Sequence, residues 1–551
     1  MPHETIADLL LARAGDDHPG LLTRERSWTW GEVVEESSAR AAWAEKLRTD
    51  GPFHIGVLLD NEPEYVFWLG AAALAGAAVV GINPTRTGPE LEREVRHTDC
   101  QVIVTDRAGA ALLDGLDVGV DHDRFLVVDA PEYGTGLAAH AGLPPRAPDV
   151  TAATRMLLLL TSGTTGTSKA AICSQGRLAG LGASNSVKYD IAREDTCYCP
   201  MPLFHGNALM ALWAPALTVG ATIALTPKFS ASGFLPDVRH FGATFFTYVG
   251  KAIGYILARP ETGQDADNRL THGFGTEASP EDMTRFLDRF GCRLVEGYGS
   301  SEGAGMLKRV PDAPTGALGT PARDGVRIVH PTTRATCPPA SLDSYGRVRN
   351  PEEAIGEIVD TEGAARFEGY YNNDAANAER VRHGWYWTGD LGYVDEAGYF
   401  YFAGRSGDWI RVDGENISAL LTERILRRHP GVVAAGAFGV PDPRSGDQVM
   451  AAVEIADGTR FEDLDLPGFL ARQEDLGSKG APRFVRVSHM LPTTGSNKLR
   501  KKEMQLDGWR TDDSVYRWEG RGRPAYAPMT DDDKAALRSE FLANGRGRFL
   551  P

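Results

Sequence analysis

Cysteine is scarce in this sequence, with six residues in a chain of 551. So few thiols over such a length favour a reducing compartment, and we expect a cytoplasmic protein. Cys197 and Cys199 form a close pair, but the residues around them do not complete a zinc site. Their spacing, with one residue between them, instead predicts a strand whose alternate side chains pack in a core.

Basic residues are also in deficit. Lysine and arginine number 58, against 74 aspartates and glutamates, so the formal net charge is −16. This charge argues against a general binder of nucleic acid. It does not exclude a small anionic ligand, because such a ligand responds to the local charge of its site.

The sequence offers little support for a membrane span. The stretch 65–82 carries no charge and reaches the length of about 18 residues that a spanning helix needs. However, Gly70, Gly76 and Gly81 interrupt it, so a helix followed by a strand explains it better. The N-terminus lacks a basic region, and its apolar core at 9–11 is too short for a signal peptide. We therefore expect no transmembrane segment.

What the first half does contain is an alternation of strand and helix patterns. Pro63 favours the start of a helix and Gly76 its end, and apolar runs on either side are typical of buried strands. Such a rhythm predicts parallel sheets with crossover helices. The predicted strands are 55–59, 77–82, 101–105, 244–247 and 293–296, and the predicted helices are 63–75, 87–98 and 251–259.

The pattern changes after about residue 320, where antiparallel features replace the alternation. Residues 392–402 are typical of a hairpin, and the polar, flexible stretch 404–408 interrupts the chain. Beyond it we predict a small α+β domain with a helix near 420–428, strands near 432–438 and 449–454, and a final helix from about 530 to Gly545. The predicted domains are residues 1–404 and 409–551, with a hinge at 405–408.

The stretch LLLLTSGTTGTSKAA at 157–171 carries the first chemical signal. Its backbone N–H groups and hydroxyls, followed by Lys169, suit a phosphate group. A Walker-type loop would need Gly-Lys-Ser/Thr leading straight into a helix. Here Ala170–Cys173 is instead typical of a second strand, and Ser174 of a helix cap. The pattern therefore predicts a strand–loop–strand cradle and disfavours a P-loop hydrolase.

Four later stretches add polar groups that a nucleotide needs. GYGSSEG (297–303) offers an aromatic ring for a base and a carboxylate for a metal, and WTGDLG (387–392) puts Asp390 on a tight turn, where it can accept from two ribose hydroxyls. GRSGDWIRVDGENIS (404–418) follows, and PTTGSNK (492–498) presents Lys498 on a loop. A lone acid on a turn is usually solvated, and a lone lysine is usually a surface charge. The order and number of these stretches make the set informative.

This set resembles the adenylate-forming superfamily of acyl-CoA synthetases, carrier-loading adenylation domains and luciferases. The resemblance covers most of the chain, from Trp28 to the C-terminal helix. Its details look like the fatty acid transport protein, or very-long-chain acyl-CoA synthetase, subgroup, although the membrane anchor of its animal members has no counterpart. The stretches that carry this finer likeness are 169–171, 248–250, 405–408, 414–418 and 494–498.

The resemblance implies an α/β fold: a large N-terminal domain of two βαβ-type sheets plus a small β-barrel, followed by a small, mobile α+β C-terminal domain. It also implies a two-step reaction. A carboxylate attacks the α-phosphate of ATP to give acyl-AMP and pyrophosphate, and the thiol of coenzyme A then displaces AMP. The C-terminal domain rotates between the steps.

The resemblance assigns roles residue by residue. Lys498 would neutralise charge on the α-phosphate, Glu302 would ligate Mg²⁺, and His205 would lie between the nucleotide and acyl pockets. Tyr298 would stack near adenine, and Asp390 would hold the ribose. The residues implied in ATP and AMP binding are Thr161, Ser162, Gly163, Thr164, Thr165, Gly166, Lys169, Gly275, Thr276, Glu277, Gly297, Tyr298, Gly299, Ser300, Ser301, Asp390 and Arg405.

The remaining roles concern the acid, coenzyme A and the hinge. The residues implied in binding the acid are His205, Asn207, Tyr248, Val249, Gly250 and Gly303. Gly414 and Glu415 would line the coenzyme A tunnel, and Gly407 and Asp408 would form the hinge. Gly250 and Gly254 could leave space for a long or bulky apolar acid, although helix packing explains them equally well.

Departures from the family pattern are small. Ser168 stands where proline is usual, which would loosen the loop, and Ser301 replaces threonine but keeps a hydroxyl. Gly407 replaces the aspartate or lysine of many relatives, so control of the rotation could differ, and Asn497 replaces a glycine.

The leading hypothesis is therefore an ATP-, Mg²⁺- and coenzyme A-dependent acid–CoA ligase acting on a fatty or other bulky apolar acid. One alternative is an acyl-AMP ligase that loads the phosphopantetheine of an acyl carrier protein. Another, of a different class, is a non-catalytic nucleotide-binding protein. The sequence does not determine the oligomeric state, and a homodimer is possible.

Overall fold

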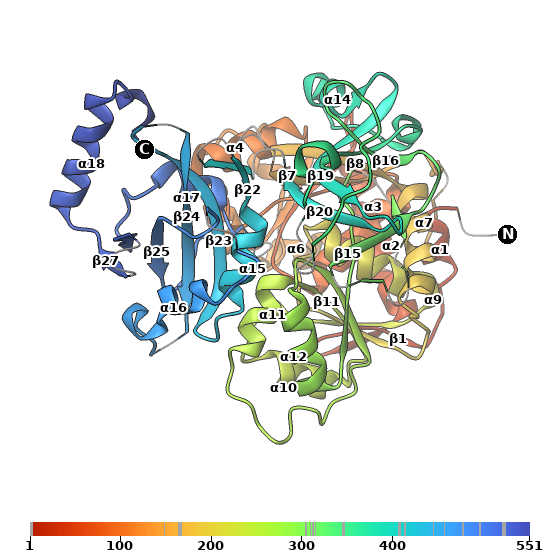
Figure 1. Cartoon of the computed structure of the whole chain (residues 1–551). Coiled ribbons are helices and arrows are strands. Elements are labelled where there is room, and N and C mark those ends of the chain that lie inside the picture. The colour runs from red at the N-terminus through yellow and green to blue at the C-terminus, as the bar shows by residue number, and fades with distance from the viewer. Residues whose placement is uncertain are drawn as a thin grey trace. The chain divides into compact units, whose positions relative to one another are not determined.

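The computed structural model describes the chain except for residues 1–3, 148, 163–167, 303–305, 309, 311–312, 315, 344–347, 406–408, 413–414, 445, 457, 477–478, 495–497, 521–524 and 551. The chain forms two compact units, each drawn with labelled elements in Figure 1. The first unit comprises residues 1–278, 283–305 and 364–381. The second unit comprises residues 279–282, 306–363 and 382–551.

One sheet of the first unit leads to the predicted phosphate loop. Its strands run parallel except for the last pair, in which β7 and β8 are antiparallel. In sheet order they are β6 (Phe125–Val127), β5 (Val102–Thr105), β3 (His54–Leu58), β4 (Ala78–Gly81), β7 (Arg155–Ser162) and β8 (Ser168–Ser174). Helix α3 (Pro63–Ala75) connects β3 to β4 and α4 (Gly88–His97) connects β4 to β5, as the alternation predicts.

Local signals explain where these helices begin and end. Pro63 occupies the first turn of α3, and Gly76 ends it in the left-handed region at φ 67°. The side chain of Ser174 caps α7 (Gln175–Lys188) by accepting from the Arg177 N–H. The stretch 65–82 is thus helix and strand, and in the described part of the chain no helix has both the length and the apolar character to span a membrane.

The other sheet of the first unit contributes three strand ends to the candidate site. It is parallel apart from its edge pair β1–β2. In sheet order its strands are β13 (Arg293–Glu296), β12 (His272–Thr276), β11 (Phe245–Val249), β9 (Thr196–Cys199), β10 (Thr222–Leu225), β1 (Pro19–Leu22) and β2 (Ser27–Thr29). Helix α11 (Gly250–Leu257) follows β11, and α12 (Pro280–Phe290) follows β12.

Strand β9 confirms the interpretation of the cysteine pair. Cys197 and Cys199 belong to one buried apolar cluster, and Tyr198 between them belongs to another. Alternate side chains therefore enter the cores on opposite faces of the sheet. All six cysteines are buried free thiols.

The second unit contains an antiparallel sheet and a C-terminal α+β assembly. The antiparallel sheet stands where a small barrel is expected, and its pairings run from β14 at one edge to β16 at the other. The strands along this path are, in order, β14 (Leu307–Lys308), β15 (Ala317–Pro321), β20 (Phe400–Arg405), β19 (Trp385–Val394), β17 (Gly356–Asp360) and β16 (Val326–Val329). A further short strand, β18 (Val381–Arg382), pairs with β19 off this path.

The C-terminal part begins with the hairpin of β21 (Trp409–Val412) and β22 (Glu415–Ser418) and continues into helix α15 (Ala419–Arg427). A mixed sheet follows, with strands β23 (Val432–Pro441), β24 (Asp447–Ile455), β25 (Phe484–Ser488), β26 (Ser514–Trp518) and β27 (Tyr526–Pro528). The final helix α18 (Asp531–Ala543) starts at a capping box on Thr530. The α/β class, with a large N-terminal part and a smaller C-terminal part, is confirmed.

Candidate active site

The β7–β8 hairpin forms the two arms of the predicted phosphate loop. Thr161 lies opposite Lys169 in the antiparallel pairing, and the Thr161 hydroxyl donates to the Lys169 carbonyl at 3.3 Å. The strand–loop–strand arrangement is therefore confirmed. The tip of the loop, residues 163–167, lies outside the described residues, and Ser162 and Ser168 pair at its base.

Lys169 is buried, and its ammonium group has a carboxylate partner. Its Nζ lies 3.2 Å from Glu379 Oε2 and 5.3 Å from the ring centroid of Tyr370. Glu379 stands on α14 (Asp374–Arg380), and its side chain is 61% exposed. The segment before α14 is tied to β8, because the Tyr371 N–H donates to the Ala170 carbonyl at 2.9 Å. A buried lysine with an exposed acidic partner suits a site that exchanges this partner for a phosphate.

Glu302 contacts the same tyrosine, Tyr370. Its Oε1 accepts a hydrogen bond from the Tyr370 hydroxyl at 2.8 Å, and Arg380 Nε donates to that hydroxyl oxygen at 3.0 Å. Burial first, and the charge of Glu302 second, raise the pKa of Tyr370, so its hydroxyl keeps its proton and acts as a donor. Tyr370 thus connects the lysine of the phosphate loop to the predicted metal ligand.

The chemistry of Glu302 suits Mg²⁺. A buried carboxylate supplies the oxygen donor that this hard cation prefers, and Mg²⁺ in nucleotide sites commonly binds one or two carboxylates together with phosphate oxygens. No group of three or more histidine, cysteine, aspartate or glutamate residues that could hold a metal occurs among the described residues. A single carboxylate completed by ATP oxygens is consistent with both observations.

The carboxyl ends of β11, β12 and β13 bring the predicted adenine residues together. Val249 pairs with Thr276, and the Gly297 N–H donates to the Gly275 carbonyl at 3.0 Å. Ligands in parallel sheets bind beyond these strand ends. Gly297, Tyr298, Gly299, Ser300 and Ser301 follow β13, and Arg177 Nη2 donates to the Ser301 carbonyl at 2.7 Å. Gly303 lies outside the described residues.

Glycines in this region serve close backbone packing. A Cβ on Gly250 would lie 1.8 Å from the Glu277 carbonyl oxygen, and one on Gly275 would lie 2.3 Å from the Tyr248 carbonyl oxygen. Glu277 itself has φ 73°, in the left-handed region that residues other than glycine rarely adopt. Space for a bulky acid at Gly250 is therefore the wrong interpretation, since backbone atoms already fill that position.

The predicted acyl-side residues cluster at the end of β11. His205 precedes the short helix α8 (Gly206–Ala208), and the Asn207 amide donates to the Tyr248 carbonyl at 3.3 Å. The other end of this amide, Oδ1, is buried and has no hydrogen-bond partner within the described structure. The Tyr248 ring is 1% exposed and packs in the core near Phe246, so the atom of Tyr248 that meets Asn207 is its carbonyl oxygen.

Asp390 corrects one expectation of local structure. It lies within strand β19, opposite Arg405 of β20, rather than on a tight turn. The cause is long-range pairing with β17 and β20, which keeps the segment extended despite the turn signal of Gly389, whose φ is 73°. A local irregularity remains, because the Asp390 N–H donates to Thr388 Oγ1 at 3.0 Å.

Lys498 is hydrogen-bonded to Thr494, and residues 495–497 between them lie outside the described residues. Its backbone N–H donates to Thr494 Oγ1 at 3.1 Å, and its carbonyl accepts from the Thr494 N–H at 2.7 Å. The backbone of Glu415 lies in β22. Gly407, Asp408 and Gly414 fall outside the described residues, so their roles stay predictions.

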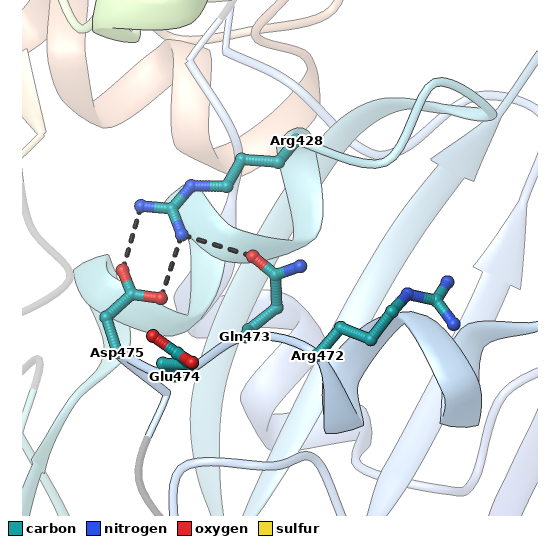
Figure 2. Close-up of a pocket in the computed structure, with 5 residues that line it drawn as sticks. All are labelled: Arg428, Arg472, Gln473, Glu474 and Asp475. Atoms are coloured by element: carbon teal, nitrogen blue, oxygen red, sulfur yellow. Dashed lines mark hydrogen bonds and ion pairs between the residues drawn. The ribbon is translucent and has the colours of Figure 1, made fainter.

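The second unit also has a surface pocket of about 330 Å³ that holds none of the predicted residues (Figure 2). Arg428 faces Asp475, with its two terminal nitrogens each 2.8 Å from a carboxylate oxygen, and it also donates to Gln473 at 3.2 Å. Arg472 and Glu474 complete the lining. Both arginines that could attract an anion have carboxylate partners, Arg428 in Asp475 and Arg472 in Asp465, which lies 3.8 Å away. This pocket therefore does not compete with the candidate site.

The structure thus brings together Lys169, Glu302, the adenine residues and the acyl-side residues within the first unit, while Asp390, Arg405 and Lys498 belong to the second. Sequence reasoning missed three residues, Tyr370, Glu379 and Arg380. No local pattern marks them, since Tyr370 and Glu379 contact partners 68 and 210 positions away, and Arg380 contacts the hydroxyl of Tyr370.

Comparisons with known proteins show the family of the chain. The chain matches the family model of AMP-binding enzymes over residues 11–371 and that of the AMP-binding enzyme C-terminal domain over residues 421–498. The chain therefore belongs to the family of AMP-binding enzymes.

Two relatives narrow the class. A steroid-22-oyl-CoA synthetase from Rhodococcus jostii is 66% identical over 547 residues, which cover 99% of each chain. A medium/long-chain-fatty-acid–CoA ligase, FadD17 from Mycobacterium tuberculosis, is 42% identical over 515 residues, which cover 93% of this chain and 98% of the relative. The protein is an AMP-forming acyl-CoA synthetase, which uses ATP to join a carboxylic acid to coenzyme A.

Solved structures support the fold. The anthranilate CoA ligase AuaEII in complex with anthranoyl-AMP superposes with a TM-score of 0.79 at 20% identity, covering 92% of this chain and 97% of that chain. ATP-bound MatB from Rhodopseudomonas palustris gives a TM-score of 0.77 at 21% identity, and the match covers 92% of this chain and 99% of that chain. At such identities the likeness shows the shared fold alone.

Proposed function

We propose that the acid is a steroid whose side chain carries the carboxyl group, and that the product is its coenzyme A thioester. The observation that carries this proposal is the 66% identity to a steroid-22-oyl-CoA synthetase along nearly the whole of both chains. The fatty-acid relative is much less similar at 42% identity. A steroid acid is also one of the bulky apolar acids that the sequence analysis expects.

The roles proposed for the site follow the two chemical steps. In the first, the substrate carboxylate attacks the α-phosphorus of ATP and pyrophosphate leaves. Lys169 and the loop at 161–166 hold the β- and γ-phosphates, and Lys498 stabilises charge that develops on the α-phosphate. Mg²⁺, held by Glu302, offsets phosphate charge when it is bound. The Lys169–Glu379 pair and the Tyr370–Glu302 hydrogen bond support these assignments.

The nucleoside half of ATP is proposed to lie along the ends of the strands. Tyr298 stacks near adenine, and the backbone at Gly275, Thr276 and Glu277 forms another edge. Asp390 accepts from the ribose hydroxyls, with Arg405 beside it in the sheet. The pairing of Asp390 with Arg405 on neighbouring strands supports this last assignment.

In the second step the thiolate of coenzyme A attacks the acyl carbon, and AMP leaves. We propose that a hinge at 405–408 lets the C-terminal domain, 409–551, rotate between the steps. Gly414 and Glu415 then line the passage for the pantetheine arm. His205 and Asn207 lie between the nucleotide and acyl sides.

The test is a screen of pyrophosphate release with three kinds of acid: a steroid acid with its carboxyl at carbon 22, a long-chain fatty acid and an aromatic acid. Each is assayed without a thiol, with coenzyme A, and with a phosphopantetheinylated carrier protein. We expect the steroid acid with coenzyme A to give the highest kcat/KM. A higher value for either other acid would overturn the proposed substrate, and a carrier protein that outperforms coenzyme A would overturn the proposed acceptor.

Some finer expectations stay predictions. They are membership of the fatty acid transport protein or very-long-chain subgroup, the carrier protein as an alternative acceptor, a homodimer and a cytoplasmic location. Light scattering on purified protein tests the homodimer directly, since a monomer would have the chain mass of 59.5 kDa.

A further inference from the structure

Glu296, the last residue of β13, makes contacts that the proposed mechanism does not use. Its Oε1 accepts a hydrogen bond from the Tyr248 hydroxyl at 2.9 Å and another from the Ala278 N–H at 3.1 Å. The N–H of Glu277 is also hydrogen-bonded to this carboxylate. One partly buried side chain therefore joins the end of β13 to β11 and to the turn that follows β12.

The turn that Glu296 holds is strained and tightly packed. Glu277 adopts φ 73°, in the left-handed region that L side chains rarely occupy. Its carbonyl oxygen lies so near Gly250 that a Cβ there would be only 1.8 Å away. Such conformations persist when the surroundings over-determine them, and they cluster at functional sites. Here Gly250 accommodates the turn on one side, and the carboxylate of Glu296 binds its backbone N–H groups on the other.

The same carboxylate connects the two halves of the candidate site. Gly275, Thr276 and Glu277 form the proposed adenine edge immediately before Ala278. The backbone carbonyl of Tyr248 accepts a hydrogen bond from the side-chain amide of Asn207 on the acyl side. A shift of Glu296 would therefore move the nucleotide edge relative to the strand that borders the acid.

We propose that Glu296 is a positioning residue, which sets the adenine edge at 275–277 by holding the backbone of the turn and the hydroxyl of Tyr248. This inference rests on the proposed function, because the adenine edge is itself a proposed role. The pKa of Glu296 is raised to about 7, because the effect of burial outweighs the hydrogen bonds from Tyr248 and the two backbone amides, which lower it. A carboxyl group in such surroundings is costly to keep for packing alone, which supports a positioning role.

The experiment measures AMP affinity by isothermal titration calorimetry for the wild type, Glu296→Gln, Glu296→Ala and Tyr248→Phe. Asp265→Asn is the matched control. Asp265 is a buried carboxylate that also holds a turn, through the Thr262 N–H at 3.2 Å, but in the loop before β12, at the opposite end of the strand.

We expect AMP affinity to fall about tenfold in Glu296→Ala and by a smaller factor in Glu296→Gln, which keeps one acceptor oxygen. Asp265→Asn should bind AMP as the wild type does. The KM for ATP should rise with the same ranking, while kcat at saturating ATP changes less. Glutamine has the shape of glutamate, so a residue that served packing alone would leave AMP affinity at the wild-type value in Glu296→Gln, and a measurable loss in this variant identifies the lost hydrogen bonds.

Wild-type affinity in Glu296→Gln and Tyr248→Phe, with both proteins folded by circular dichroism, would overturn the inference. These two variants keep the shape of the side chain, so they remain informative if Glu296→Ala does not fold. A wild type that binds no AMP would instead overturn the proposed nucleotide site itself. The two failures are therefore distinguishable in one set of titrations.

Discussion

The Tyr370 hydroxyl donates a hydrogen bond to Glu302 Oε1 at 2.8 Å, although the two residues are 68 positions apart in the sequence. Tyr370 also lies beneath the ammonium group of Lys169, whose Nζ is 5.3 Å from its ring centroid. One aromatic residue thus touches both the proposed metal ligand and the lysine of the phosphate loop. Tyr370 therefore links the two side chains that are proposed to act on the triphosphate of ATP, Lys169 directly and Glu302 through Mg²⁺.

Replacing Tyr370 with phenylalanine should weaken the use of Mg²⁺. The change removes the donor that orients Glu302, and loss of such a supporting hydrogen bond typically costs 10–100-fold in metal affinity or activity. We expect about tenfold more Mg²⁺ to be needed for half-maximal pyrophosphate release. Direct titration of ATP-bound protein with Mn²⁺, followed by electron paramagnetic resonance, gives a readout independent of turnover.

Tyr371→Phe is the control for that variant. Its hydroxyl donates to Asp99 at 2.7 Å instead of to Glu302, so the same chemical change is made one residue away. Equal Mg²⁺ midpoints in the two variants would show that Tyr370 does not orient the metal ligand.

Replacing Glu379 with glutamine should improve the affinity for ATP. The carboxylate forms an ion pair with Lys169, so its removal leaves the lysine available for phosphate. Because Glu379 is 61% exposed, the ion pair is worth little, and we expect the KM for ATP to fall only about two- to threefold. Asp374→Asn, which removes an exposed charge from the first turn of the same helix, should leave the KM unchanged. A KM that rises in Glu379→Gln would contradict the idea that phosphate displaces this partner.

Replacing Lys498 with alanine should separate the two half-reactions. Formation of acyl-AMP should fall by about 10²–10³, the usual loss for one preorganised charge-stabilising group. Thioester formation from supplied acyl-AMP should be retained, because the proposed rotation carries Lys498 away from the site. Arg500→Ala, two residues further on, is a suitable control. Equal losses in both half-reactions, in a protein that remains folded, would refute the role.

Some of this architecture could be predicted from the sequence because the deciding signals are local. Helix α3 runs from Pro63 to Ala75 as expected, since proline and glycine act at its two ends. Ser174 caps α7 for the same reason, and the antiparallel β7–β8 pair follows from two apolar strands around one loop. The glycine-rich and acidic motifs likewise lead to the candidate site at Lys169 and Glu302, whose roles stay predictions.

Other features depend on distant partners. Asp390 is extended because β17 and β20 pair with its strand, which overrides the local turn signal of Gly389. Glu379 reaches Lys169 across 210 positions, and no pattern around either residue predicts the pair. The sequence alone does not decide whether Gly250 makes space for the acid or allows close packing. The carbonyl oxygen of Glu277, which lies where a Cβ of residue 250 would be, shows that close packing requires the glycine.

The stability of the protein should depend on pH through Glu296. Its pKa is raised from 4.5 to about 7 in the folded state, so between these values the folded protein binds a proton that the unfolded chain has lost. Raising the pH through this window therefore destabilises the wild type, and the effect is complete above about pH 7. Glu296→Gln cannot titrate, so its free energy of unfolding relative to wild type should rise by on the order of 1–3 kcal/mol between pH 5 and pH 8. Urea denaturation at both pH values measures this difference, and a constant difference would contradict the assignment.

The most direct test of the proposed activity is a competition between acids. Wild-type protein is incubated with ATP, Mg²⁺, coenzyme A and equal concentrations of a steroid acid with its carboxyl at carbon 22 and a long-chain fatty acid. Mass spectrometry of the early products gives the ratio of the two kcat/KM values. We predict that the steroid thioester is formed at least about tenfold faster, a difference of roughly 1.4 kcal/mol in transition-state stabilisation. Equal amounts of the two thioesters, or an excess of the fatty acyl product, would contradict the account.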